Sequence, residues 1–171
     1  MAPRAAPAAL GLFGLALPDQ DGLDLLAFGR AWQAALDRHD ILRSSFHWLG
    51  LDSAHQVIQR QVDVQLHVIE DIDADFDALA EAEREKGFAL NAAPLFRLML
   101  VRGAGNAWHL IFTSHHILMD GWSNAQLLGE VIAHYAGQAL PAPLGQQRVI
   151  FLHADEDDNR EPVNRLTSPP L

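Results

Sequence analysis

The chain has 171 residues, of which 49% are hydrophobic and 20% charged, a composition typical of globular proteins rather than disordered or fibrous ones. Twelve Lys and Arg residues oppose 22 Asp and Glu residues, and the resulting net charge of -10 argues against nucleic acid or anionic lipid as a partner. Because the chain has no cysteine, disulfides, thiolate metal sites and cysteine nucleophiles are excluded. We expect a cytoplasmic protein without a membrane span.

The first half of the chain predicts apolar strands around one amphipathic helix. Residues 11–17 predict a buried strand rather than a signal peptide, because the run is short and no small-residue cleavage site follows. A helix with Asp21 as its N-cap is expected after a turn at 18–22. Its core stripe is Leu25, Phe28, Trp32 and Leu36. Further strands are expected at 42–48, 55–59 and 62–68.

The second half predicts the centre of a sheet. A helix is expected to begin in the acidic segment 71–77 and to stop at Gly87. Two nearly continuous apolar strands at 95–101 and 108–113 indicate strands that are covered on both faces. The order of helices and strands predicts a mixed α/β layer fold.

The last predicted helix begins at a capping box that opens with Ser123, and it ends at Gly137. Its buried face is expected to contain Leu127, Leu128, Val131, Ile132 and Tyr135. A Pro-containing linker follows this helix, and we expect disorder from about Asp155 on.

Residues 114–123, Ser-His-His-Ile-Leu-Met-Asp-Gly-Trp-Ser, lie between a predicted central strand and the last helix, where a rigid scaffold holds a loop. Three interpretations compete on chemistry alone. One histidine could be a general base near neutral pH. His115, His116 and Asp120 could bind a metal, although adjacent histidines seldom converge on one ion. The histidines could also be structural, with Asp120 capping the helix.

The full pattern His-His-x-x-x-Asp-Gly at 115–121 resembles the active-site motif of the condensation domains of nonribosomal peptide synthetases, which belong to the chloramphenicol acetyltransferase-like superfamily. Residues 38–46 resemble a second motif of that family, Arg-His-acid-x-Leu-Arg-small-x-Phe. Residues 93–97 resemble its Pro-Leu-aliphatic-Arg segment. The three features occur in the family's order, and the resemblance covers about residues 10–140.

The resemblance implies an α/β fold, a chloramphenicol acetyltransferase-like lobe with a mixed β-sheet packed with helices. Residues 1–145 would form the N-terminal lobe of a condensation domain, and residues 146–171 an unmatched, disordered tail. The implied reaction is the attack of an acceptor aminoacyl amine on a donor acyl or peptidyl thioester. Both substrates would be carried on phosphopantetheine arms of carrier-protein domains, and the chain itself would bind no cofactor and no metal.

The resemblance also implies roles for individual residues. His116 would face the substrate tunnel as general base or as the group that positions the amine, and His115 would support the loop. The backbone N–H of Gly121 would help to hold the thioester. Asp120 would pair with Arg43 to fix the loop. Apart from the resemblance, Arg97 is expected at a sheet edge or in a buried pair rather than in catalysis.

Complete condensation domains have two such lobes and are more than twice as long as this chain. We therefore expect the chain to be inactive without the second lobe or adjacent synthetase modules, whether it represents a truncated gene, a frameshift or a genuine short protein. Two alternatives remain open: a non-catalytic module that docks carrier proteins, and a stand-alone O- or N-acyltransferase that uses acyl-coenzyme A.

Overall fold

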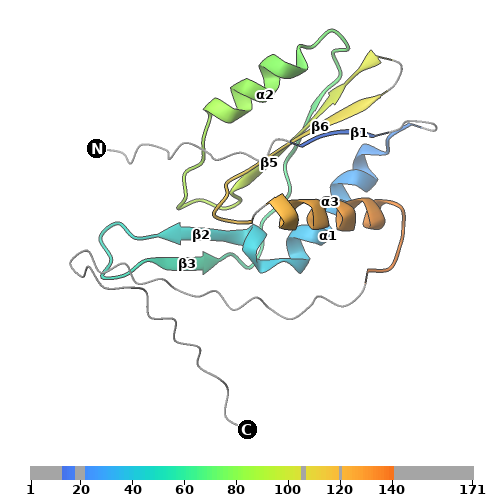
Figure 1. Cartoon of the computed structure of the whole chain (residues 1–171). Helices are drawn as coiled ribbons and strands as arrows, with labels where there is room; N and C mark the ends of the chain where they lie inside the picture. The colour runs from blue at the N-terminus through green and yellow to red at the C-terminus, as the bar shows by residue number, and fades with distance from the viewer. Residues whose placement is uncertain (1–12, 18–21, 105–106, 120, 141–171) are drawn as a thin grey trace.

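A computed structural model of the chain describes residues 13–17, 22–104, 107–119 and 121–140 (Figure 1). In chain order the elements are β1 (Phe13–Leu17), α1 (Leu25–Arg38), the short 3-10 helix η1 (Asp40–Arg43), β2 (Ser44–His47), β3 (His55–Ile58), β4 (Leu66–Ile69), α2 (Phe76–Glu85), β5 (Phe96–Arg102), β6 (Trp108–Ser114) and α3 (Gly121–Tyr135). The predicted mixed α/β class is confirmed.

The main sheet has the strand order β1-β6-β5-β4, so the two strands predicted for its centre are indeed central. β6 pairs antiparallel with both β1 and β5, whereas β4 pairs parallel with β5. β2 and β3 form a separate antiparallel hairpin that extends away from the sheet (Figure 1). α2 lies on one side of the main sheet, and α1 and α3 lie together on the other.

Each face of the sheet has its own apolar core. On the α1 side, Phe28, Trp32 and Leu36 of the predicted stripe are at most 1% exposed. The Trp32 ring stacks on Phe96 of β5 at 6.0 Å and meets Phe112 of β6 at 5.2 Å between centroids. On the α2 side a smaller cluster contains Ala80, Met99, Val101 and Ile111. The full coverage explains why β5 and β6 carry apolar residues almost without interruption.

Two predicted helix starts are wrong. The N-cap of α1 is Asp24, not Asp21; its side chain accepts a hydrogen bond from the backbone N–H of Ala27 at 2.9 Å. Gly22, with a φ of 89°, turns the chain before that cap. α3 begins at Gly121, so Ser123 lies inside the first turn and is not an N-cap.

Three further details depart from the sequence patterns. Residues 42 and 43 of the strand predicted at 42–48 belong instead to η1, in which Arg43 forms an ion pair with Asp40 three residues earlier. Residues 62–65 alternate in burial as predicted, but regular pairing begins only at Leu66. On α3, Val131 is buried and Ile132 is 41% exposed, because adjacent helical residues point about 100° apart.

Residues 141–171 lie outside the described residues, and so do the expected tail and the proposed boundary at residue 145. Within residues 13–17, 22–104, 107–119 and 121–140, no helix combines the length and the apolar character that a membrane span requires.

The aromatic core on the α1 side should dominate stability. Trp32→Ala removes a side chain with 0% exposure between two central strands, and we expect it to lower the free energy of unfolding by about 3–5 kcal/mol. Leu26→Ala on the same helix, where the side chain is 76% exposed, is the matched control and should change it by less than about 0.5 kcal/mol. Urea unfolding followed by circular dichroism measures both. Equal losses in the two variants would contradict the packing of α1 described above.

Candidate active site

The predicted motif forms a tight turn between the central strand β6 and the helix α3. β6 ends at Ser114, which is buried, and α3 begins at Gly121. Leu118 in the turn is also buried and packs into the core on the α1 side. Both ends of the turn are thus attached to the core, which restricts the positions of the two histidines.

His115 uses its backbone and its ring to build this turn. Its N–H donates to the carbonyl of Leu95 at 3.0 Å, and its own carbonyl accepts from the N–H of Leu118 at 3.0 Å. Its ring Nδ1 lies 3.1 Å from the backbone nitrogen of Ile117, whose N–H donates to it. A ring nitrogen that accepts a hydrogen bond carries no proton, so this geometry requires His115 with Nδ1 unprotonated.

The surroundings of His115 favour the same neutral state. Burial lowers the pKa of His115 below its ordinary value, and the neighbouring His116 lowers it further through charge repulsion. A neutral ring with the proton on Nε2 is therefore the state compatible with both the hydrogen bond and the electrostatics. The supporting role that the resemblance implied for His115 stays a prediction.

His116 has the opposite environment. Its side chain is exposed, as is that of Ile117, while His115 is half-buried and Ser114 is buried. Gly121, at the first position of α3, is exposed as well, and a β-carbon built there would meet no atom within 4 Å. Both the His116 ring and the first turn of α3 are therefore accessible from outside the lobe.

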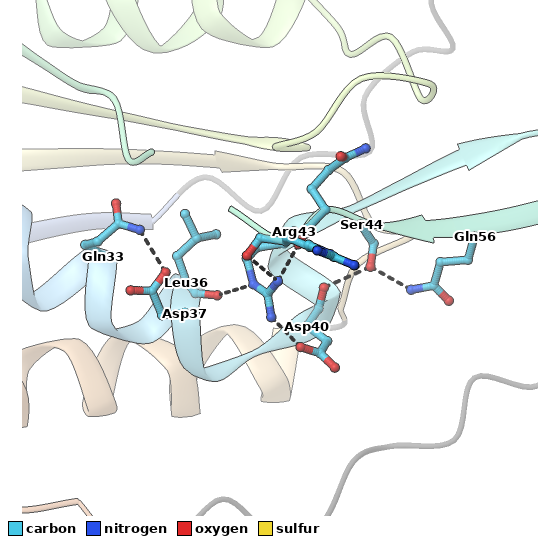
Figure 2. Close-up of polar contacts among 9 residues, drawn as sticks. Gln33, Leu36, Asp37, Asp40, Arg43, Ser44 and Gln56 are labelled. Atoms are coloured by element: carbon cyan, nitrogen blue, oxygen red, sulfur yellow. Dashed lines mark hydrogen bonds and ion pairs between the residues drawn. The ribbon is translucent and has the colours of Figure 1, made fainter. Parts of the chain in front are cut away.

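Arg43 is anchored within its own segment, as Figure 2 shows. Its Nε donates to the carbonyl of Leu36 at 3.1 Å, and its Nη2 forms an ion pair with Asp40. Its Nη1 donates to the carbonyls of Gln59 and Arg60, the latter at 3.3 Å.

These contacts use four of the five N–H donors of the Arg43 guanidinium. Arg43 thus links the end of α1 to η1 and to the segment after β3. Asp120 lies outside the described residues, so its pairing with Arg43 stays a prediction.

The second motif also contributes contacts between helices. His39 Nε2 lies 2.7 Å from Oε2 of Glu130, and Arg38 Nε lies 3.4 Å from the same oxygen. Glu130 belongs to α3, so the hydrogen bond from His39 and the ion pair with Arg38 connect the end of α1 to the helix that follows the His115–His116 turn. The sequence assigned no role to His39, because its partner is 91 residues away.

Of the two positions expected for Arg97, a sheet edge or a buried pair, it takes the second, because it lies on the central strand β5 and pairs with a buried carboxylate. Its Nε donates to Oε2 of Glu83 at 2.6 Å, and the Glu83 side chain is only 5% exposed. Arg97 also covers the ring of Phe88, with its guanidinium carbon 4.1 Å from the ring centroid. The Phe88 ring in turn packs edge-on against His115, at 6.4 Å between centroids and 86° between planes.

Glu83 and Phe88 were not identified as site residues from the sequence. A signal for Glu83 exists, because it falls at helical spacing from Phe76, Leu79 and Ala80, on an otherwise apolar stripe. A lone carboxylate on a buried stripe requires a cation, and Arg97 interrupts an apolar strand in the same way. Phe88 carries no comparable signal, because its contact with His115 arises only in the folded chain.

Within the part of the chain that the structure describes, no three His, Asp or Glu side chains gather in a group that could hold a metal ion. Asp120, the third ligand in the metal interpretation, is outside that part.

Comparison with known proteins identifies the family. The family model of the condensation domain matches residues 16–160. Chondramide synthase cmdD of Chondromyces crocatus is 40% identical over 126 residues, which cover 71% of this chain and 3% of that protein. Tyrocidine synthase 2 of Brevibacillus parabrevis is 36% identical over 119 residues, which cover 70% of this chain and 3% of that protein.

A solved structure that concerns condensation domain-mediated chain release from the enacyloxin polyketide synthase has the same fold. It superposes with a TM-score of 0.66 and 25% identity over 84% of this chain and 29% of that chain. The predicted chloramphenicol acetyltransferase-like lobe is therefore confirmed. This chain spans only 3% of the length of the two synthases it matches.

The environment of His115 predicts a pH dependence of stability. Because the pKa is lowered in the folded state, the unfolded state binds more protons below the ordinary histidine pKa of about 6.5. The contribution of the neutral ring is therefore complete above about pH 6.5 and is lost as the pH falls toward the lower pKa of the folded state. Between pH 7 and 5 the wild type should lose more stability than His115→Asn, whose side-chain oxygen still accepts a hydrogen bond but does not titrate.

Urea unfolding at several pH values gives these slopes. His134→Asn, at an exposed position of α3, is the matched control and should keep the wild-type slope. Parallel stability curves for the wild type and His115→Asn would show that the ring is not held neutral in the folded state.

Proposed function

Because this chain belongs to the condensation-domain family, we propose that it is the motif-bearing lobe of a peptide-bond-forming condensation domain of nonribosomal peptide synthesis, with His116 as its reactive side chain. One observation carries the proposal: the motif turn exposes His116 at the end of a central strand and holds His115 from three sides. An accessible imidazole on a fixed backbone is suited to proton transfer near neutral pH.

The proposed reaction joins two carrier-bound substrates. The amine nitrogen of the acceptor attacks the thioester carbonyl carbon of the donor, so that a C–N bond forms and the C–S bond breaks. The amine gives up a proton and the departing thiolate takes one. We assign His116 the contact with the attacking amine, as general base or as the acceptor that positions it.

Other residues of the motif would act around this step. Gly121 would offer its backbone N–H to the thioester at the accessible first turn of α3. Asp120 would use the remaining N–H donor of Arg43 and so tie the turn to η1. The partners would be carrier-protein domains that present their substrates on phosphopantetheine, together with neighbouring synthetase modules.

We propose further that catalysis requires a second lobe. The solved chain with the same fold is matched over only 29% of its length, so the described residues would supply one wall of the site. Acyl transfer needs the reacting atoms held about 3–3.5 Å apart, and a single wall leaves both substrates free to move.

The test supplies the purified chain with carrier proteins loaded with a donor and an acceptor. Dipeptidyl thioester should form when the second lobe of a related condensation domain is added, and His116→Ala should lower its rate by about 10²–10⁴-fold, the range for loss of a general base. His134→Ala, at an exposed histidine of α3, is the matched control and should retain the rate. Mass spectrometry of the acceptor carrier protein measures the product.

Each other outcome decides against part of the proposal. Robust turnover by the chain alone, lost in His116→Ala, would overturn the dependence on a second lobe. Carrier binding without product under all conditions, unchanged in His116→Ala, would identify a docking module instead. Turnover of acyl-coenzyme A that rises with protein concentration would identify a stand-alone acyltransferase.

A further inference from the structure

We propose that Glu83, Arg97 and Phe88 form a positioning relay that selects the ring orientation and tautomer of His115 and thereby fixes the turn that presents His116. The proposal deepens the proposed function, because it names residues outside the motif on which the reactive histidine depends. None of the three is assigned contact with a substrate.

The relay begins with a guanidinium that is held at three points. Nε of Arg97 donates to the Glu83 carboxylate at 2.6 Å, and Nη2 donates to the Glu83 backbone carbonyl at 2.8 Å. Nη1 donates to the carbonyl of Gly87 at 2.8 Å. Three bonds from different nitrogens fix both the position and the plane of the group, which a single ion pair would not.

The charge of Glu83 is maintained although the side chain is buried. Burial alone would raise the pKa of Glu83, but hydrogen bonds from Lys86 and Arg97, together with their charges, outweigh burial and hold the pKa below its ordinary value. The anchor of the relay is therefore ionised at neutral pH. Lys86 binds the other carboxylate oxygen and is itself mostly exposed.

The second step is the contact between Arg97 and Phe88. Gly87 follows the end of α2 and has a φ of 59°, a left-handed conformation that reverses the chain direction before Phe88. The guanidinium carbon of Arg97 lies 4.1 Å from the Phe88 ring centroid, and Phe88 is only 6% exposed. A cation over a desolvated ring face holds that ring in one orientation.

The last step reaches the motif. Arg97 is paired with Thr113 across β5 and β6, and His115 lies two residues beyond Thr113, so Arg97 and His115 belong to the same face of the sheet. The Phe88 ring bridges them, at 86° to the His115 ring. An edge-on neighbour disfavours rotation of the imidazole, and the retained orientation points Nδ1 at the Ile117 N–H.

The experiment observes the ring nitrogens of His115 in the full chain labelled with ¹⁵N-histidine, with the signal assigned by its loss in His115→Asn. In the wild type Nδ1 should be unprotonated and Nε2 protonated. Phe88→Leu keeps the apolar bulk but removes the ring, and Arg97→Met removes the cation. In both variants the two nitrogen shifts should move toward each other as the tautomers mix.

Lys86→Met is the matched control, because it removes one of the two cationic partners of Glu83 and leaves the Arg97–Phe88 contact in place. It should keep the wild-type nitrogen shifts. Circular dichroism establishes that each variant is folded; if Arg97→Met does not fold, Phe88→Leu decides. Unchanged shifts in the folded variants would overturn the relay.

This readout is independent of catalysis. If the ring signals respond as expected but no dipeptidyl thioester forms with a second lobe, the relay stands and the proposed function fails. If the signals do not respond, the relay fails whatever the condensation assay gives.

Discussion

The antiparallel pairing of β5 with β6 determines where the main sheet ends and where the turn with the two histidines begins. All seven residues of each strand are in register, from Phe96 opposite Ser114 to Arg102 opposite Trp108. The pair is continued one step further by the hydrogen bond from the His115 N–H to Leu95. Because helices cover both faces, neither strand can slip without exposing apolar residues or burying polar ones. The turn after β6 therefore begins at a fixed point.

Such coverage leaves few ways to place a polar group near the motif. A buried carboxylate without a cation would be neutralised or would destabilise the fold, and Glu83 avoids both outcomes through Lys86 and Arg97. A similar constraint acts on the other side, where Arg38 and His39 meet Glu130 between α1 and α3. In both places one carboxylate contacts two side chains, and the elements that flank the turn are held together by polar contacts as well as by packing.

Much of this arrangement was predictable from local patterns. The stripe Phe28, Trp32 and Leu36 and the two long apolar strands follow directly from periodicity, because burial on one or two faces leaves a repeating signal. The exact start of α1 does not follow from periodicity, since Asp21 satisfies the same capping rules as Asp24, the N-cap in the structure. Likewise, Ser123 satisfies the capping rules although α3 begins at Gly121. Contacts such as His39 with Glu130 or Phe88 with His115 depend on tertiary packing, and no local pattern records a partner so distant in the chain.

The two adjacent histidines illustrate how one strand end produces two different environments. His115 is half-buried, whereas His116, which follows it in the turn after β6, is exposed. His115 meets Phe88 and accepts from Ile117, and it can do so only when neutral. The hydrogen bonds of His115 also restrict the backbone at His116, whose own side chain is exposed. With two histidines at this turn, one ring takes part in its hydrogen bonds while the other stays exposed, as the proposed role of His116 requires.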